Sequence, residues 1–332
     1  MRLSTIDQGR GSEALYANQR PQLLSRLSED ARIESITASN AIEGIELSRP
    51  RASAIARGRV SFRNRTEKEF AGYRDALDGL IRSDPEPISE PLILHLHRAL
   101  LHHVGGGGGS YKRMPNEITS RESGTREVVF RPPPPEETEF LMSELLARYS
   151  QARDESAAHP VLLIAALALD LLAIHPFADG NGRTTRLATN SELLYCGYGV
   201  VRYASLEQRI FDSKQVYYAS LYQSQRQWVE TEGGHDIWPW AEYFVNVLAD
   251  SYSDFAKRVA AAGSMDGVSR QQQVEQWITE DAPEAFSIAE VESALPGVSN
   301  STIRLVLARM RDEGKLSATR GRSAKWRKTD AQ

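Results

Sequence analysis

The sequence is poor in cysteine, in long hydrophobic runs and in charge of a single sign. Cys196 is the only cysteine of 332 residues, so an intrachain disulfide is excluded and an oxidising compartment is not indicated. The most apolar run, 161–174, is too short to span a bilayer and contains Asp170. The net charge of −4 argues against a protein that is basic throughout, as many nucleic-acid binders are. Residues 1–9 are polar and lack the apolar core of a signal peptide, so we expect a cytoplasmic protein without a membrane partner.

Strand signals are also scarce, and the expected fold class is therefore mainly α. Apolar residues at helical spacing predict helices around residues 24–42, 70–80, 136–152 and 161–174, the last of them buried. In the third of these helices, Leu141, Leu145 and Tyr149 are expected on one face. The Arg-rich stretch 49–65 has few large apolar residues and is expected to be a solvated helix or loop.

Two further segments break the helical pattern. Residues 118–130 have a polar centre with Ser123 and Gly124 and end in Val128, Val129 and Phe130, which predicts a β-hairpin. Residues 105–109 are five glycines, which we interpret as a flexible loop. A phosphate-binding loop of the Gly-Lys-Ser/Thr type is excluded there, because that tripeptide does not follow.

The C-terminal part predicts a separate small domain. A linker is expected around 260–270, and helices are expected at 271–279, 288–295 and 299–314. Residues 315–328 alternate apolar and polar side chains around Gly321, as a hairpin does. The order helix, helix, turn, helix, hairpin is that of a winged helix-turn-helix. The expected domains are thus an N-terminal helical region (1–95), a central core (96–260) and a winged-helix domain (265–330).

The run HPFADGNGRTTR, residues 175–186, carries the chemistry. Two glycines at a helix start leave backbone N–H groups at 180–182 uncovered, so a polyphosphate can lie against them. Arg183 and Arg186 can face the same way and suit phosphate oxygens. Asp179 is a hard oxygen ligand beside that site, the usual arrangement for Mg²⁺. His175 can accept a proton from a hydroxyl at neutral pH. Each feature alone would usually be structural, but together at this spacing they are hard to explain by chance.

This run matches every defining position of the Fic signature, His-Pro-Phe-x-Asp-Gly-Asn-Gly-Arg-x-x-Arg, and the sequence resembles the Fic family up to about residue 250. One departure is Tyr111-Lys112, where many relatives have an aromatic residue followed by Arg, and little consequence is expected. The resemblance implies a Fic-type helical core with a small β-hairpin flap and protein adenylyltransferase activity. Such an enzyme moves AMP from ATP to a Ser, Thr or Tyr hydroxyl of a protein and uses Mg²⁺.

The resemblance also implies residue roles. His175 would be the general base, Asp179 would hold Mg²⁺ between the α- and β-phosphates, and Phe177 would pack in the core. The hairpin resembles the family's flap, which pairs with the target backbone by strand addition. Tyr217 and Tyr218 are expected near the nucleoside, but a place in the core is an alternative for both. The residues expected around the nucleotide are Gly180, Asn181, Gly182, Arg183, Arg186, Val128, Val129, Phe130, Tyr217, Tyr218 and Gln225.

Residues 39–44 read SNAIEG and fit Ser/Thr-x-x-x-Glu-Gly/Asn, a pattern that means little by itself. In a Fic-like chain it resembles the autoinhibitory helix, with Ser39, Glu43 and Gly44 as its marked positions. A Glu43 carboxylate paired with Arg186 would occupy the guanidinium that the γ-phosphate needs. Autoinhibition is therefore expected.

Alternatives to this function stay open at this point. The same site could remove AMP, with Glu43 orienting water. It could also transfer a phosphate as in the Doc-like branch, but that branch resembles Ala-Asn-Lys where this chain has Gly180-Asn181-Gly182. The chain could also be a DNA-binding regulator whose core only senses nucleotide. Basic residues in the C-terminal tail favour DNA contact. In a winged helix, residues 299–301 would start the recognition helix and Gly321 would turn the wing. Winged helices also dock proteins, so a protein partner of this domain is an alternative. The expected partners are a protein bound by the flap, the chain itself as a substrate, and DNA.

Overall fold

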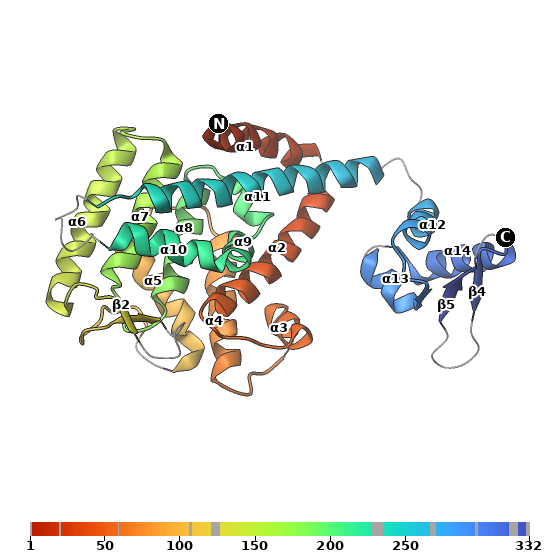
Figure 1. The fold of residues 1–332 in the computed structure, drawn as a ribbon, viewed down its shortest axis with the longest axis horizontal. Helices are drawn as coiled ribbons and strands as arrows, with labels where there is room; N and C mark the ends of the chain where they lie inside the picture. Colours follow the sequence, from red (N-terminus) through yellow and green to blue (C-terminus); the bar gives the residue numbers. More distant parts are fainter. Residues whose placement is uncertain are drawn as a thin grey trace. The chain divides into compact units, whose positions relative to one another are not determined.

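The computed structural model describes residues 2–19, 21–58, 60–105, 108–120, 127–226, 235–265, 270–295, 298–318 and 325–329. These fold into two compact units, 1–256 and 257–332 (Figure 1). The predicted division at residues 95/96 lies inside the first unit, and the three-domain division stays a prediction. The linker expected at 260–270 begins later than predicted, because helix α11 (Trp238–Met265) continues to Met265.

The first unit is built almost wholly from helices, which confirms the mainly α fold class. Two short strands form its hairpin. Besides α11, its elements are α1 (Arg2–Gln19), α2 (Pro21–Ile42), α3 (Arg49–Ala56), α4 (Arg65–Arg82), α5 (Glu90–Leu101), η1 (His102–Val104), β1 (Ile118–Ser120), β2 (Glu127–Phe130), α6 (Pro135–Asp154), α7 (Pro160–Ile174), α8 (Asn181–Tyr195), η2 (Gly199–Arg202), α9 (Leu206–Asp212) and α10 (Lys214–Gln225).

Helices α7 and α8 form the centre of this unit. The sequence of α7 is apolar nearly all round, and the helix is buried as predicted, packed against α6 and α8. Helix α8 also contacts α5, α4 and α2, and nearly all of its side chains are buried although many are polar. Because α8 begins inside the unit, its first turn and its two arginines lie in the interior.

The Arg-rich stretch is more ordered and more buried than predicted. It contains α3, which packs against α4 and α2 and buries Ala52, Ile55 and Ala56. The small alanines let α3 approach its neighbours closely. The prediction of a solvated segment is therefore wrong for the face of α3 that carries the buried residues.

The buried face of α6 is shifted by one position from the prediction. Thr138, Met142, Leu146 and Tyr149 are buried, whereas Leu145 is only partly covered. Leu145 and Leu146 are both one turn from Tyr149, so the spacing alone could not decide between them.

The predicted hairpin is present. Strand β1 pairs antiparallel with β2, with Ile118 opposite Phe130 and an irregular register beside it. Its tip, including Ser123 and Gly124, lies outside the described residues, as do Gly106 and Gly107 of the glycine run. Val128 and Val129 are exposed on β2.

The second unit has its own apolar core. The predicted helices correspond to α12 (Arg270–Glu280), α13 (Ile288–Ala294) and α14 (Asn300–Asp312). The predicted hairpin corresponds to β4 (Leu316–Ala318) and β5 (Trp326–Lys328), whereas Gly321 lies outside the described residues. A third strand that the sequence analysis missed, β3 (Ala285–Phe286), pairs with β5, giving the order β3-β5-β4. Its two residues are too few to show an alternating pattern. The buried core residues are Val274, Ile278, Ala282, Phe286, Val291, Ile303, Val306, Leu307, Met310 and Leu316.

Within the described segments, no helix is both long enough and apolar enough to cross a membrane.

Two glycines of α4 give a matched test of the packing of α4 on α5. A Cβ at Gly72 would lie 1.9 Å from the carbonyl oxygen of Leu100, whereas a Cβ at Gly79 would meet nothing within 4 Å. Gly72→Ala should lower the free energy of unfolding by about 1–3 kcal/mol or more, because backbone of α5 has to move. Gly79→Ala should raise it by about 0.5–1 kcal/mol, since alanine favours a helix. Urea unfolding of both variants measures the difference, and equal effects would contradict this packing.

Candidate active site

The run 175–186 connects the end of α7 to the start of α8. His175 ends α7 in the left-handed conformation, with φ 50° and ψ 58°, and its N–H donates to the carbonyl of Leu171. Its Nδ1 lies 3.2 Å from the carbonyl oxygen of Leu172. Because a carbonyl only accepts, Nδ1 carries the proton in this contact, and Nε2 is left as an acceptor. This tautomer is the one that a general base requires.

Lys112 and Asn116 brace the backbone around His175. The buried ammonium of Lys112 donates to the carbonyl of Ile174 at 3.0 Å and to Asn116 Oδ1 at 3.0 Å. The amide of Asn116 in turn donates to the carbonyls of His175 and Phe177. Burial lowers the pKa of Lys112 to about 8. Lys112 therefore holds the loop in place, a role that the sequence analysis did not assign.

The His175 ring is held in its neutral form. Burial is the largest cause that lowers its pKa, to about 4, and the positive charge of Lys112 acts in the same direction. The hydrogen bond to Leu172 and the charge of Glu43 oppose the shift. The ring therefore stays unprotonated well below the ordinary range of histidine.

The segment between the two helices is fixed by side chains that face inward. Phe177 is buried, as expected, and stacks on His97 with ring centroids 3.7 Å apart. His97 Nε2 lies 3.1 Å from the carbonyl oxygen of Asp179, and its Nδ1 accepts from Gly109 N–H at 2.9 Å. Asn181 turns back to bond both the N–H and the carbonyl of Phe177. Asp179 itself is left with its carboxylate half-exposed.

The first turn of α8 offers an anion site. Gly180 caps the helix with φ 79° and has no side chain to bond the first turn, while the Gly180 N–H itself donates to Asp179 Oδ1 at 2.6 Å. The first N–H groups of a helix have no partner within it, and the helix dipole favours negative charge there. A Cβ at Gly182 would lie 2.3 Å from Glu43 Oε1. Glycine at 182 is thus what allows a carboxylate to come this close to the helix.

The end of α2 occupies Arg186. The guanidinium of Arg186 donates from Nε to Ser39 Oγ at 2.9 Å and from Nη2 to the Ser39 carbonyl at 2.9 Å and Glu43 Oε1 at 2.8 Å. Gly44 adopts φ 75° directly after Glu43 and ends the helix there. Arg186 is buried, whereas 34% of the Glu43 side chain is exposed. Burial opposes the charged form of Glu43, but the pKa is nonetheless lowered because Arg186, Arg183 and His175 lie close.

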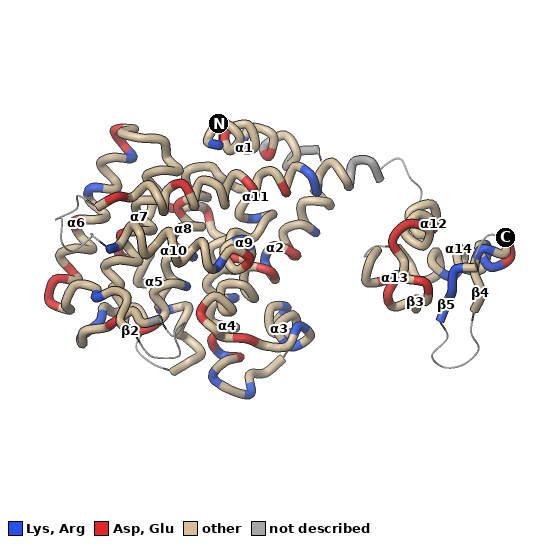
Figure 2. Tube along the Cα trace, viewed as in Figure 1, with Lys and Arg blue, Asp and Glu red and all other residues tan. Residues whose placement is uncertain are grey.

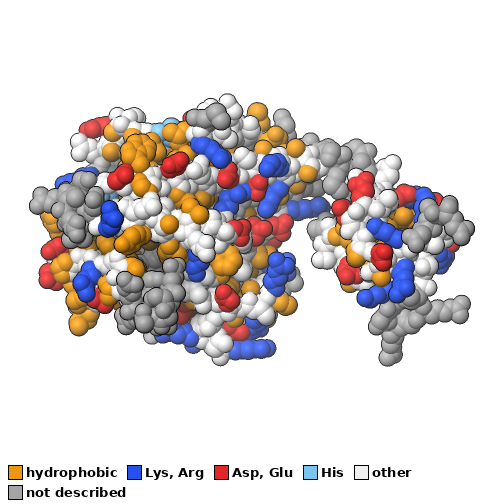
Figure 3. All heavy atoms as spheres, in the orientation of Figure 1, with side chains coloured by type: hydrophobic (Ala, Val, Ile, Leu, Met, Phe, Trp, Pro, Cys, Tyr) orange, Lys and Arg blue, Asp and Glu red, His pale blue; other side chains and the backbone are white. Residues whose placement is uncertain are grey.

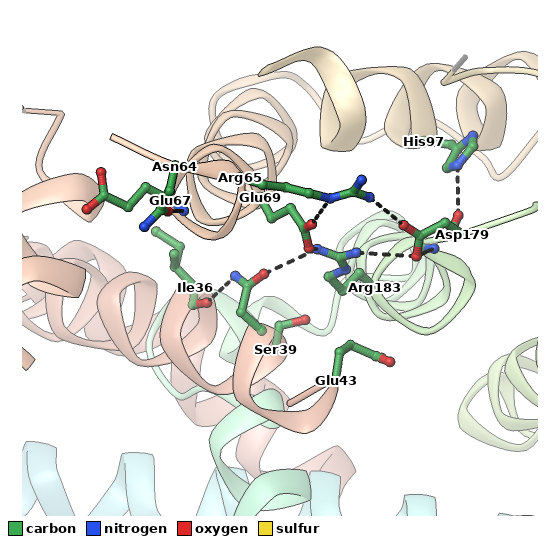
Figure 4. A network of polar contacts seen from close by, with 12 residues as sticks. Ile36, Ser39, Glu43, Asn64, Arg65, Glu67, Glu69, His97, Asp179 and Arg183 are labelled. Carbon is green, nitrogen blue, oxygen red and sulfur yellow. Dashed lines mark hydrogen bonds and ion pairs between the residues drawn. The ribbon is translucent and has the colours of Figure 1, made fainter. Parts of the chain in front are cut away.

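Arg183 points toward α4 and is also buried (Figure 4). Its Nη1 donates to Glu69 Oε2 at 3.0 Å and lies 3.4 Å from Asn40 Oδ1. Its Nη2 lies 3.7 Å from Asp179 Oδ1. The two arginines therefore reach different neighbours, although they lie three residues apart on one helix.

Two donors beside this site have no partner among the described residues: Nε of Arg183 and Nη1 of Arg186. Buried polar groups are usually hydrogen-bonded, and an anion is the natural partner for a guanidinium N–H. The orphaned donors therefore fit a phosphate group.

Asp179 is the carboxylate that could hold a metal ion here. Its side chain is 54% exposed. In the described part of the chain, no group of three or more His, Cys, Asp or Glu side chains could hold a metal. Mg²⁺ commonly binds through one or two carboxylates together with phosphate and water oxygens, so Asp179 fits an ion that arrives with a nucleotide.

The remaining predicted residues are spread around the site. Tyr217 is buried and packs against Trp240 and Tyr243, which is the core alternative of the sequence analysis. Tyr218 is exposed, with its hydroxyl 3.4 Å from the carbonyl oxygen of Ile42. Gln225 is buried near the end of α10. The flap residues Val128, Val129 and Phe130 lie on β2, which contacts α10.

Sequence reasoning missed several residues that touch the run. Asn40, Arg65, Glu69, His97 and Asn116 come from distant segments, and the last four fit no motif. Only Asn40 could have been found, because it lies inside the run 39–44 that was singled out.

This chain is similar to known proteins both in sequence and in fold. Residues 87–193 match the model of the Fic/DOC family, so the chain contains a Fic/DOC family domain. The protein adenylyltransferase Fic of Drosophila melanogaster is 30% identical over 204 residues, which cover 59% of this chain and 39% of that protein. The corresponding protein of Drosophila persimilis is 29% identical over 204 residues, 59% of this chain and 38% of that protein. The chain thus spans about two fifths of the length of these relatives.

Two solved structures show the same fold. A Fic family protein from Desulfovibrio desulfuricans superposes with a TM-score of 0.63 at 23% identity, covering 100% of this chain and 95% of that one. A Fic domain containing signaling protein from Bacteroides thetaiotaomicron gives a TM-score of 0.62 at 24% identity, covering 77% of this chain and 97% of that one. At this identity the likeness concerns the fold alone.

The lowered pKa of His175 can be tested directly. In NMR titrations of the ring, His175 should stay neutral from pH 8 down to pH 5.5 and protonate near pH 4, because burial disfavours the charged ring. Glu43→Gln should lower the pKa further, since it removes a negative charge that stabilises the protonated ring. Protonation at pH 6.5 or above, or a rise in the Glu43→Gln chain, would contradict the arrangement.

Proposed function

We propose that the Fic/DOC domain of this chain transfers AMP from ATP to a Ser, Thr or Tyr hydroxyl of a protein, and that the end of α2 holds it in an inhibited state. One observation carries both parts: the Glu43 carboxylate pairs with Arg186 and approaches Gly182 at the first turn of α8. A helix start beside a buried guanidinium is a site for an anion. The carboxylate takes the place of a phosphate group there.

The orphaned donors support ATP as the ligand. In the proposed complex, phosphate oxygens would accept from Nε of Arg183 and Nη1 of Arg186 and from the first N–H groups of α8, at 181 and 182. The Gly180 N–H, which the sequence analysis also expected to be uncovered, already donates to Asp179 Oδ1. Asp179 would hold Mg²⁺ on the open side of the loop. When bound, Mg²⁺ would neutralise charge on the phosphates and leave the α-phosphorus open to attack.

The proposed reaction uses His175 as the base. The hydroxyl oxygen of the target attacks the α-phosphorus while its proton passes to His175 Nε2. The bond from that phosphorus to the oxygen bridging the α- and β-phosphates breaks, and pyrophosphate leaves with the bonding electrons. The other residues position the phosphates and neutralise their charge, which is how phosphoryl transfer is generally catalysed. The relatives named protein adenylyltransferase support this class of reaction.

The hairpin β1–β2 is the proposed dock for the target. Val128 and Val129 are exposed on a short strand, and an extended peptide could add to such an edge. Tyr218 is the proposed neighbour of the nucleoside, because it is exposed beside the end of α2, whereas Tyr217 is better assigned to the core. The chain itself is a further proposed substrate.

Removal of AMP is the alternative that a specific observation favours. Glu43 lies close enough to His175 for its charge to raise the pKa of that ring. The same carboxylate approaches the first turn of α8 at Gly182, where it could orient a water molecule for hydrolysis. Glu43 would then be required for activity, whereas inhibition makes it an obstacle, and this difference decides the experiment below.

The second unit is the part for which we propose contact with DNA, through a winged-helix arrangement. Its three helices and its small sheet support this, and Figure 2 shows Lys and Arg gathered on α14 and β5 and Asp and Glu on α12 and α13. The positive charge is partly compensated, because Arg309 and Lys315 both pair with Glu275 and Glu313. On the face in Figure 3, charges of both signs are interspersed among the described residues, so any DNA contact would be local.

Replacing Glu43 tests the proposed function. Glu43→Gly should raise the initial rate of α-labelled AMP incorporation, including self-labelling, by about tenfold or more, because it frees Arg186 for a phosphate. Arg186→Ala should be poorly active, and adding Glu43→Gly to it should give little further gain, since the partner is gone. The rates of the wild type, both single variants and the double variant give the answer.

Two controls accompany this measurement. Glu46→Gly removes an exposed carboxylate just beyond the helix end and should leave the rate unchanged. Adding His175→Ala to the Glu43→Gly chain should abolish transfer while Mg²⁺–ATP still binds. A folded Glu43→Gly chain that binds ATP but labels no faster than wild type would refute inhibition, and faster loss of AMP from a labelled target with wild type would favour removal.

The DNA proposal is tested on α14. The chain should retard duplex DNA with a steep salt dependence, and Arg304→Glu should weaken retention and reduce the salt slope by about one unit. Arg148→Glu reverses another exposed arginine, on α6, and serves as the matched control. Equal effects of the two changes, or no retention at low salt, would favour a protein partner for this unit.

A further inference from the structure

Glu69 lies between two arginines beside the proposed phosphate site. It comes from α4 and is buried, and its two oxygens are used by different partners. Oε2 accepts from Arg183 Nη1 at 3.0 Å, and Oε1 accepts from Arg65 Nε at 2.8 Å. Figure 4 shows the Glu69 side chain pointing toward Arg183.

Glu69 uses only one end of the Arg183 guanidinium. It takes Nη1, whereas Nε has no partner among the described residues. At Arg186 the situation differs, because the end of α2 occupies Nε and Nη2. The Glu69 contact thus orients Arg183 and leaves its Nε as a buried donor that the oxygen of a bound phosphate could satisfy.

Glu69 also directs Arg65 toward Asp179. The Arg65 side chain is 68% exposed, and its Nη2 lies 3.5 Å from Asp179 Oδ2. On the other side of Asp179, Arg183 Nη2 lies 3.7 Å from Oδ1. One buried carboxylate therefore places a cation on each side of the proposed Mg²⁺ ligand.

We propose that Glu69 is a positioning residue of the phosphate site, which fixes Arg183 and Arg65 around Asp179 so that they receive the polyphosphate of Mg²⁺–ATP. The positioning role of Glu69 rests on the proposed function, because the anion that the two arginines would bind is the triphosphate of ATP. An arginine held by a resident carboxylate is already ordered before the ligand arrives, so less conformational entropy is lost on binding. Groups that orient metal ligands from the second layer are commonly worth about 10- to 100-fold in affinity or activity, and we expect an effect of the same order for Glu69.

The rival explanation is that Glu69 only stabilises α4. The same helix provides a matched control, because Glu67 is a second buried carboxylate that holds an arginine. Its oxygens accept from Arg51 Nε and Nη2, both at 2.7 Å, and from the N–H of Arg63. Glu67 lies on the side of α4 away from Asp179 in Figure 4. A change at Glu67 tests the stability of α4 without touching Arg183 or Arg65.

The experiment compares Glu69→Gln and Glu67→Gln in the full chain carrying Glu43→Gly. Binding of Mg²⁺–ATP and of adenosine is measured by calorimetry, and thermal unfolding is followed in parallel. Glu69→Gln should weaken Mg²⁺–ATP about 10- to 100-fold and change adenosine binding less than about twofold, because the nucleoside carries no phosphate. Glu67→Gln should lower the melting temperature and leave both affinities within about twofold of the parent chain.

Each outcome decides the proposal. It is overturned if Glu69→Gln binds Mg²⁺–ATP as well as or better than the parent, if it loses ATP and adenosine equally, or if Glu67→Gln shows the same loss. If Glu69→Gln does not fold, Glu69→Asp keeps the charge but shortens the reach, and the same selective loss is expected. A parent chain that binds Mg²⁺–ATP but transfers no AMP would refute the proposed function, while the selective loss in Glu69→Gln would still support the positioning role.

Discussion

Two arginine side chains are buried beside the first turn of α8, and the rest of the site depends on how their charge is balanced. An isolated buried charge is very costly, so each guanidinium needs an anion close by. Arg183 is balanced by Glu69 and Arg186 by Glu43. Both carboxylates come from outside the run 175–186, so the N-terminal helices complete a site that the central segment only begins.

The two ion pairs differ in their access to solvent. Glu69 is buried in the body of α4, whereas Glu43 is the last residue before the turn at Gly44 and a third of its side chain is exposed. Removing one partner of a buried pair typically costs about 3–5 kcal/mol, because a charge is left alone. The Arg183 pair is therefore suited to persist. The Arg186 pair can be exchanged, provided that another anion replaces the carboxylate.

The sequence predicted the parts of the site that lie within one short segment. His175, Asp179 and the glycines of 180–182 form a single loop and helix start, where the chemistry follows from local backbone geometry. Glu43 could be predicted because a second short pattern marks it. Glu69, His97 and Asn116 could not, because only the packing of α4, α5 and the 111–117 segment brings them to the loop. The same reason explains the fold: long apolar helices such as α7 were predictable, whereas the two-residue strand β3 and the choice between Leu145 and Leu146 depend on neighbours distant in sequence.

Exchange of anions at Arg186 has a thermodynamic consequence. If phosphate and the Glu43 carboxylate compete for one guanidinium, binding of one weakens binding of the other by the same factor. Any interaction that stabilises the last turn of α2, such as the contacts of Ser39 with Arg186, then lowers the affinity for the productive nucleotide pose. Conversely, a partner that loosens this turn raises that affinity without touching the nucleotide. Under the proposed function, the end of α2 is therefore the element through which a signal elsewhere on the N-terminal helices would reach the chemistry at His175.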